Sequence, residues 1–260
     1  MTPPRGYDIE AVLGRGRCSV VYLAREQRGQ RKVALKMARR TTLASARQDF
    51  SAEFAALSAL ASRHVVQVFG HGVSGGDAFL AMEAALGSLP PGRRAAVEVL
   101  PLMRQAATAL QQLHAQHWVH RDVKPANLLV RADGSLALAD FGCARRQGAA
   151  DPLEKDTVVG TPQYSAPEQF QGAPAQPAAD VYSLGAVLHE LLCGEPPFPG
   201  QTPAELFSQH LLAPVPRLAQ EHAAWQPLLD AMLAKDPAAR PAGAGDLLER
   251  LQRQEMRMPS

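Results

Sequence analysis

Four polar residues of this chain have the types and the spacing that could transfer a phosphoryl group. Asp122, Lys124 and Asn127 stand close together, and Asp140 opens an Asp-Phe-Gly tripeptide shortly after them. A carboxylate such as Asp122 can accept the proton of an attacking hydroxyl, and a lysine two residues later can neutralise charge on the transferred phosphoryl group. Mg²⁺ prefers oxygen ligands such as the Asn127 amide and the Asp140 carboxylate, together with substrate phosphates. The set therefore predicts phosphoryl transfer from a metal-bound nucleotide.

A glycine-containing turn upstream could bind the phosphates. Gly14 and Gly16 lie between two expected strands, and glycines let backbone N–H groups approach phosphate oxygens closely because they have no Cβ. The turn is not a Walker A loop, because no Gly-Lys-Ser/Thr follows it. Nor is it a dinucleotide fingerprint, because a strand follows where a helix N-terminus would be needed. Taken alone, a Gly-x-Gly pair is also typical of an ordinary hairpin turn.

Lys36 ends the expected strand Val33-Ala34-Leu35-Lys36, about twenty residues after the glycine turn. That position predicts a lysine beneath the bound phosphates, although an isolated lysine of this kind usually lies on the surface. A lysine with this role needs an ion partner. Glu53 on the following helix is favoured, and Asp49, one turn earlier, is the rival. A glutamate on a helix can also simply face water.

Two different sets of elements must position these residues. The first part of the chain predicts short strands separated by Gly-containing turns, at 7–13, 19–26, 32–37, 65–70 and 78–83. Apolar residues recurring at helical spacing predict a helix over about 44–61, after the third strand. The second part predicts helices at 97–116, 181–192, 203–212, 225–233 and 245–254, and two short strands at 128–130 and 136–139 around an Asp-Gly turn.

The composition changes near residues 86–92, which indicates a hinge between two lobes. We expect an α+β fold with a small antiparallel sheet lobe and one helix over about 7–86, a hinge over about 83–89 and a mainly helical lobe over about 90–254. A chain of 260 residues is long for one core, so two tightly joined lobes in a single domain over 1–260 fit its length. A cleft between lobes is a common place for a nucleotide.

The overall composition excludes several classes of protein. A net charge of +2, from 27 basic and 25 acidic residues, is too balanced for nucleic acid to be the main partner. Three cysteines without a CxxC pair argue against a disulfide framework or a zinc site, and fit a reducing compartment. The start of the chain lacks the apolar segment of a signal peptide, and no stretch reaches the roughly 18 uninterrupted apolar residues of a membrane helix. We therefore expect a soluble, cytoplasmic chain without a membrane segment.

On these residues the chain resembles a eukaryotic-type (Hanks-type) serine/threonine protein kinase, from about Tyr7 to Leu251. The resemblance is carried by the segment from His120 to Asn127, the Asp-Phe-Gly tripeptide, the glycine turn, the strand lysine and Ala166-Pro167-Glu168. It implies a bilobal protein-kinase-like fold. Lys124 and Gly160-Thr161-Pro162 resemble the serine/threonine class, and the abundance of Ala, Arg and Pro suggests a bacterial source.

The resemblance implies transfer of the ATP γ-phosphate, with Mg²⁺ or Mn²⁺ as the metal, to Ser and Thr hydroxyls of proteins, including other copies of the same chain in trans. It also implies that Asp180 braces the catalytic loop and that Arg240 pairs with Glu168. The catalytic roles would fall on Asp122, Lys124, Lys36 and Glu53, and metal binding on Asn127 and Asp140.

The nucleotide contacts follow from the same resemblance. Met82 resembles the gatekeeper, and the backbone of Glu83 and Ala85 would meet the adenine edge. The side chains of Val21, Ala34 and Leu129 would sandwich the ring. Met82 and Leu129 can equally be ordinary core packing, and both interpretations can hold at once. The implied ATP-binding residues are Leu13, Gly14, Gly16, Val21, Ala34, Lys36, Met82, Glu83, Ala85 and Leu129.

A regulatory phosphate is a further hypothesis. Thr157 lies four residues before Thr161, where many family members accept an activating phosphate, and Arg121 and Arg145 resemble the basic pocket that holds it. A phosphothreonine carries about −1.5 to −2 charges and could order the loop through these arginines. Thr157 can also be only a polar loop residue. Thr161 itself is expected to bond Asp122 and Lys124.

The chain departs from the family pattern in its phosphate loop and in two cysteines, and two alternative functions are to be weighed. Ser19 replaces the third glycine of the family's phosphate loop, which puts nucleotide affinity in question, and Cys18 and Cys143 could lie near the nucleotide. A catalytically silent pseudokinase scaffold would lack one of the key residues, yet all are present. A small-molecule phosphotransferase of the same general fold usually lacks the equivalents of Lys124 and the Ala-Pro-Glu tripeptide.

Overall fold

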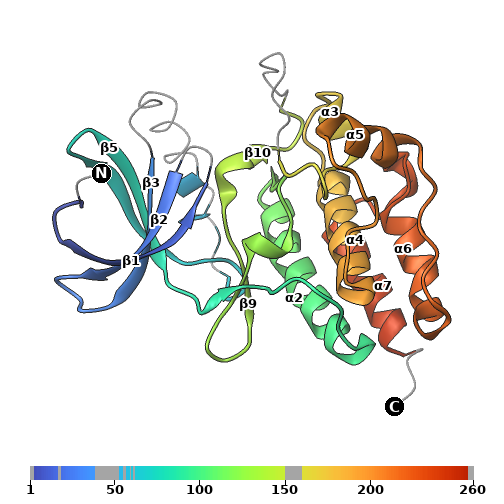
Figure 1. The fold of residues 1–260 in the computed structure, drawn as a ribbon, viewed down its shortest axis with the longest axis horizontal. Helices are drawn as coiled ribbons and strands as arrows, with labels where there is room; N and C mark the ends of the chain where they lie inside the picture. Colours follow the sequence, from blue (N-terminus) through green and yellow to red (C-terminus); the bar gives the residue numbers. More distant parts are fainter. Residues whose placement is uncertain are drawn as a thin grey trace.

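A computed structural model describes residues 3–16, 19–38, 53–54, 57–58, 60, 62–149 and 160–256 of the protein. Figure 1 shows two lobes side by side, a sheet built from the first part of the chain and a larger body of helices built from the rest. The bilobal α+β fold predicted from the sequence is therefore confirmed.

Among the described residues, the sheet of the smaller lobe has five strands, namely β1 (Tyr7–Arg15), β2 (Ser19–Glu26), β3 (Lys32–Ala38), β4 (Val68–Ser74) and β5 (Asp77–Glu83). They pair antiparallel in the order β1-β2-β3-β5-β4. Since side chains alternate across a strand, Leu35 and Met37 of the central strand β3 pack in a small cluster on the outer face. Ala34 and Lys36 share the opposite face, where Ala34 belongs to the main core. Lys36 is thereby directed toward the larger lobe.

One strand begins later than the sequence predicts. A strand was expected at 65–70, but β4 begins at Val68. Val65 instead forms a parallel bridge with Leu138, and the N–H of Val66 donates to the Leu138 carbonyl at 2.9 Å. The two valines therefore join the smaller lobe to a strand of the larger one.

The helix predicted over about 44–61 is described only at a few positions. Glu53, Phe54, Leu57 and Ser58 are helical, Leu60 is not, and the rest of that span lies outside the described residues. Leu57 is part of the main core and Phe54 packs against it. Glu53, only 1% exposed, is carried on the same buried side of this helix.

The larger lobe contains a two-stranded sheet, a three-stranded sheet and a set of helices. Its short strands are β6 (Gly87–Ser88), β7 (Trp118–Val119), β8 (Leu128–Val130), β9 (Leu136–Leu138) and β10 (Arg145–Arg146). Its α-helices are α2 (Ala96–Ala115), α3 (Pro167–Phe170), α4 (Pro177–Cys193), α5 (Pro203–Leu212), α6 (Gln226–Met232) and α7 (Ala244–Glu255). Short 3₁₀ helices lie at Pro125–Asn127, Phe141–Cys143, Gln220–Trp225 and Pro237–Ala239.

Helix α4 is the centre of this lobe, with α2, α6 and α7 packed around it (Figure 1). Nearly all of its residues are buried. It begins at Pro177, four residues before the predicted start at Val181, because proline is well suited to the first turn of a helix. The helix consequently includes Asp180, which is fully buried. Across the described ranges, the structure contains no helix whose length and hydrophobicity would let it cross a bilayer.

Candidate active site

A buried carboxylate on α4 holds the backbone that leads into the candidate catalytic loop. Asp180 Oδ2 accepts the N–H of His120 at 2.8 Å, and Oδ1 accepts the N–H of Arg121 at 2.7 Å. His114 of α2 contributes a third contact, with Nε2 2.9 Å from Oδ2. Complete burial alone would raise the pKa of Asp180. The hydrogen bonds from His114 and from the backbone N–H of Arg121 help to outweigh burial, and the pKa lies below its ordinary value. Asp180 is therefore an ionised clamp on the loop.

The Asp122 carboxylate lies at the centre of a hydrogen-bonded group and is 8% exposed. Its Oδ2 accepts from Lys124 Nζ at 2.7 Å and from Asn127 Nδ2 at 3.0 Å. Its Oδ1 accepts from the Thr161 hydroxyl at 2.8 Å, and that hydroxyl accepts from Lys124 Nζ at 2.5 Å. Three residues predicted from the sequence are thus brought together around the carboxylate of a fourth.

A glycine lets the segment that carries Thr161 approach the loop so closely. Gly160 has a φ of +92°, and a Cβ on it would lie 2.9 Å from the carbonyl oxygen of Arg121. Any side chain here would be both strained and too close to the backbone. Gln169, which the sequence did not single out, adds a second link because its Nε2 donates to the same Arg121 carbonyl at 2.8 Å.

The second group of site residues joins the two lobes. Lys36 Nζ donates to both carboxylate oxygens of Glu53, at 3.0 and 2.8 Å, and to Asp140 Oδ1 at 2.8 Å. Glu53 Oε1 also accepts the N–H of Phe141 at 3.1 Å. Lys36 therefore has the partner that the sequence favoured, while the rival Asp49 lies outside the described residues.

These contacts set the charges of the group. Burial alone would lower the pKa of Lys36. The carboxylates of Glu53 and Asp140 outweigh burial and raise this pKa above its ordinary value, so the ammonium is charged. Against the effect of burial, Lys36 lowers the pKa of Asp140 to about 2. Burial raises the pKa of Glu53. Because Glu53 accepts three hydrogen bonds from donors, we assign it as ionised near neutral pH.

Two backbone positions at the site lie in the left-handed region without being glycine. Arg121 has a φ of +69° and Asp140 a φ of +62°. Each such residue costs of order 1–3 kcal/mol and persists only where its surroundings hold it. Asp180 and Gln169 hold the backbone of Arg121, and Lys36 holds the side chain of Asp140. The sequence carries no signal for this conformation.

Asn127 and Asp140 offer the chemistry that a magnesium ion requires. Both hydrogen bonds of the Asn127 side chain within the described residues use its amide nitrogen, as donor to the carbonyl and to the carboxylate of Asp122. The amide oxygen is left as a ligand, and Asp140 supplies an ionised carboxylate whose side chain is 46% exposed. One or two such oxygens plus substrate phosphates suit Mg²⁺.

A sequence profile described as the protein kinase domain matches residues 7–251. This chain belongs to that family. It is 36% identical to the serine/threonine-protein kinase PknD of Mycobacterium tuberculosis over 261 residues, which covers 93% of the chain and 38% of the relative. It is 34% identical to PknL of Mycobacterium bovis over 244 residues, which covers 91% of the chain and 61% of the relative. It is 33% identical to PknH of the same organism over 258 residues, which covers 93% of the chain and 42% of the relative. The kinase domain described here thus spans less than two thirds of each of these relatives. Protein kinases generally use ATP and Mg²⁺.

The residues expected to contact ATP gather on both sides of the boundary between the lobes. Gly14 pairs with Val21, Val21 with Lys36, and Ala34 with Met82 across the sheet. Ala34 and Met82 belong to the main core, and Val21 and Leu129 pack against it half-buried. Leu13 is 52% exposed, and the N–H of Gly16 donates to the Ser19 carbonyl at 2.8 Å. Residues 17–18 of the glycine turn, including Cys18, lie outside the described residues.

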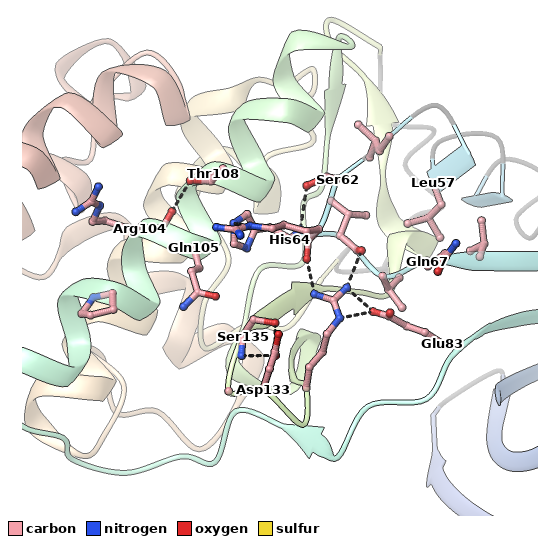
Figure 2. A pocket seen from close by; sticks show the side chains of 18 of the residues that line it. Leu57, Ser62, His64, Gln67, Glu83, Arg104, Gln105, Thr108, Asp133 and Ser135 are labelled. Atoms are coloured by element: carbon pink, nitrogen blue, oxygen red, sulfur yellow. Dashed lines mark hydrogen bonds and ion pairs between the residues drawn. The ribbon is translucent and has the colours of Figure 1, made fainter. Parts of the chain in front are cut away.

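The hinge has a contact that the sequence did not indicate. The side chain of Glu83, at the end of β5, forms an ion pair with Arg131 at 2.6 Å, whereas Ala85 follows in the connection to β6. Both residues line a cavity of about 1020 Å³ behind the hinge, and Figure 2 shows Glu83 in the wall of this cavity. Glu83 is the one residue of the expected ATP set that lines this cavity.

The regulatory hypothesis stays a prediction. Thr157 lies outside the described residues. Arg121 is 2% exposed, and Arg145 is half-buried in β10, with Nη1 donating to the Ala144 carbonyl at 2.9 Å. Cys143, which follows the Asp-Phe-Gly tripeptide, is a half-buried free cysteine. Burial, together with the Asp122 and Asp140 carboxylates, raises the pKa of its thiol to about 11.

Proposed function

We propose that this kinase domain transfers the γ-phosphate of ATP to serine and threonine hydroxyls of proteins. One observation supports the proposal above all, namely the hydrogen-bonded group of Asp122, Lys124 and Thr161. It combines a proton acceptor, a cation for the transferred group and a hydroxyl that bonds both of them. The names of the relatives, all serine/threonine-protein kinases, agree with this choice of acceptor.

In the proposed reaction, Asp122 accepts the proton of the substrate hydroxyl as that oxygen bonds to the γ-phosphorus and the bond to the β-phosphate oxygen breaks. Lys124 neutralises charge on the transferred group, and Lys36 holds the other phosphates while Glu53 positions it. Asn127 and Asp140 would hold Mg²⁺, or Mn²⁺ in its place. When bound, the metal neutralises charge that develops on the phosphate oxygens. Catalysis then comes mainly from positioning and electrostatics.

Several finer points belong to the same proposal. The single kinase domain would occupy residues 1–260, with the lobes at about 7–86 and 90–254. Substrates would be proteins, including other copies of the chain in trans, with Thr157 as a candidate acceptor. The cysteine usage supports a cytoplasmic location. A pseudokinase scaffold is disfavoured because Lys36, Asp122, Asn127 and Asp140 are all present.

The experiment is phosphate transfer from labelled ATP with Mg²⁺, comparing the wild type with Asp122→Asn and mapping phosphosites by mass spectrometry. Label on Ser or Thr that is lost in Asp122→Asn would support the proposal. Asp133→Asn is a matched control, because Asp133 lies on the exposed β8–β9 turn and bonds Ser135 at 2.9 and 2.7 Å, away from Asp122. A wild type that binds ATP but transfers no phosphate at any enzyme concentration would instead support the scaffold.

A further inference from the structure

The guanidinium group of Arg131 links three parts of the chain behind the hinge. These are the end of β5, the segment after β8 and the segment at 62–67. Nε and Nη2 of Arg131 both donate to Glu83 Oε1, at 3.1 and 2.6 Å. Nη2 also donates to the carbonyl oxygen of Val65 at 3.2 Å, and Nη1 donates to that of Arg63. The guanidinium therefore bonds both the Glu83 carboxylate and the backbone of the segment at 62–67, and Figure 2 draws these contacts as dashed lines.

Each of the three parts leads to a residue of the proposed nucleotide site. Glu83 is itself the hinge residue whose backbone is expected at the adenine edge. Arg131 directly follows β8, which carries Leu129, and lies in the hairpin that runs on to Asp140. The 62–67 segment follows the helix that carries Glu53.

Backbone hydrogen bonds run alongside the guanidinium and connect the same three parts. The N–H of Glu83 donates to the carbonyl of Gln67 at 2.8 Å, and the N–H of Leu138 donates to that of His64 at 2.8 Å. A shift of the hinge would therefore be resisted at two layers, the backbone and the Arg131 side chain. Of the two, only the side chain can be altered by substitution without removing a strand or turn.

We propose that Arg131 is a positioning residue for the nucleotide, acting through Glu83. This inference rests on the proposed function, in which the Glu83 backbone meets adenine. The two side chains are 21% and 20% exposed, so their attraction is screened less than that of a surface pair. A guanidinium has five donors in a fixed planar arrangement, which lets one group serve a carboxylate and two carbonyls at once. With this clamp in place, the hinge peptide is held in one position before ATP arrives, so binding need not order it.

The same cavity wall supplies a matched control. Arg104 of α2 pairs with Glu255 at 2.8 Å, but these side chains are 48% and 52% exposed and neither bonds the hinge among the described contacts. Arg104→Gln removes an arginine from the same cavity and leaves the Glu83 carboxylate paired. Its nucleotide affinity is expected to match that of the wild type.

The test measures the Kd for ATP by calorimetry together with kcat and the KM values for ATP and for a generic protein acceptor. In Arg131→Gln we expect the Kd and KM for ATP to rise about tenfold, with kcat and the acceptor KM within about twofold of the wild type. Glu83→Gln should give a similar change. Because both act through one contact, the double variant should be no worse than the more affected single variant, rather than about a hundredfold worse.

A merely structural role would lower the melting temperature of Arg131→Gln and leave the ATP constants unchanged, and that outcome would overturn the inference. Additive effects of the two substitutions would overturn it as well. If Arg131→Gln does not fold, Arg131→Lys keeps the charge without the planar fork, and an unchanged Kd for ATP in that variant contradicts the proposal. This outcome can be told apart from a failure of the proposed function. Even if the wild type transfers no phosphate, the Kd for ATP can still be compared between the wild type and Arg131→Gln.

Discussion

The hydroxyl of Thr161 donates a 2.8 Å hydrogen bond to the carboxylate of Asp122, thirty-nine residues away along the chain. The same hydroxyl accepts from Lys124 Nζ at 2.5 Å. Thr161 therefore occupies one oxygen of the proposed catalytic carboxylate, while Lys124 and Asn127 occupy the other. This arrangement sets the orientation in which the carboxylate would meet a substrate hydroxyl.

Replacing this hydroxyl should lower the rate of transfer more than the affinity for ATP. In Thr161→Val, which keeps the shape of the side chain, Asp122 and Lys124 both lose a partner. We expect kcat to fall about 10- to 100-fold, equivalent to about 1–3 kcal/mol, with the KM for ATP nearly unchanged. Thr161→Ser retains the hydroxyl and should remain within a few-fold of the wild type. Equal activities of the two variants in a steady-state assay would contradict the role proposed for Thr161.

The buried Asp180 carboxylate should be essential to the stability of the catalytic loop. It accepts two backbone N–H groups and contacts His114, whereas an asparagine would offer one oxygen and turn an NH₂ group toward another donor. We expect Asp180→Asn to lower the free energy of unfolding by about 2–4 kcal/mol and to abolish transfer. Urea denaturation measures the first effect. Asp230→Asn, at a partly exposed aspartate, is the control and should change stability by less than about 0.5 kcal/mol. An Asp180→Asn protein as stable as the control would show that the carboxylate is not needed.

Elements that depend on local patterns could be predicted from the sequence. β2 has the predicted bounds, Ser19–Glu26, and α5 has the predicted bounds, Pro203–Leu212. The start of α5 is set locally, because the Thr202 side chain caps the helix by accepting the N–H of Glu205 at 3.2 Å. The site residues could also be found from local sequence, since they lie in short motifs of unusual composition.

Features that depend on distant partners could not be predicted. The two-residue strands β7 and β10 exist only because they pair with each other. In the sequence, Arg131 has the appearance of an ordinary surface arginine after a strand. Its carboxylate partner, Glu83, is forty-eight residues away along the chain, so no local pattern indicates the pair.

The ion pair between Arg240 and Glu168 should be a large contributor to stability. Nη1 and Nη2 of Arg240 donate to the two oxygens of Glu168 at 2.6 and 2.9 Å, and the arginine side chain is fully buried. Arg240 also lies over the ring of Tyr182, 4.7 Å from its centroid. Removing one partner leaves the other as a buried unpaired charge, so Arg240→Ala should cost about 3–5 kcal/mol in denaturant unfolding.

The double variant Arg240→Ala/Glu168→Ala separates the pair from the rest of the packing. Its cost should be clearly smaller than the sum of the two single costs, because neither charge is then left without its partner. Strict additivity would show that the two side chains act independently. Arg253→Ala, at an exposed i,i+4 pair with Glu249, should change stability by only a few tenths of a kcal/mol.

The stability of the protein should also depend on a buried histidine beside the Thr161 segment. His210 of α5 is fully buried, and its Nδ1 lies 2.8 Å from the Tyr182 hydroxyl. Burial, helped by the charge of Lys235, lowers the pKa of His210 to about 4. The unfolded chain, with an ordinary pKa near 6.5, binds the proton more readily than the folded one between these values. The stabilising contribution is therefore complete above pH 6.5 and is lost as the pH falls toward 4, by at most about 3 kcal/mol.

Urea denaturation between pH 4 and 8 measures this loss against a variant that does not titrate. His210→Gln should be less stable than the wild type at pH 7, and the difference should shrink as the pH falls to 4. His117→Asn is the control, because His117 is exposed with a φ of +57°, a conformation that asparagine tolerates, and it should follow the wild-type pH dependence. Carboxylates titrate in the same range in all three proteins, so the difference between the curves isolates the histidine. Parallel curves for the wild type and His210→Gln would mean that His210 titrates normally in the folded protein.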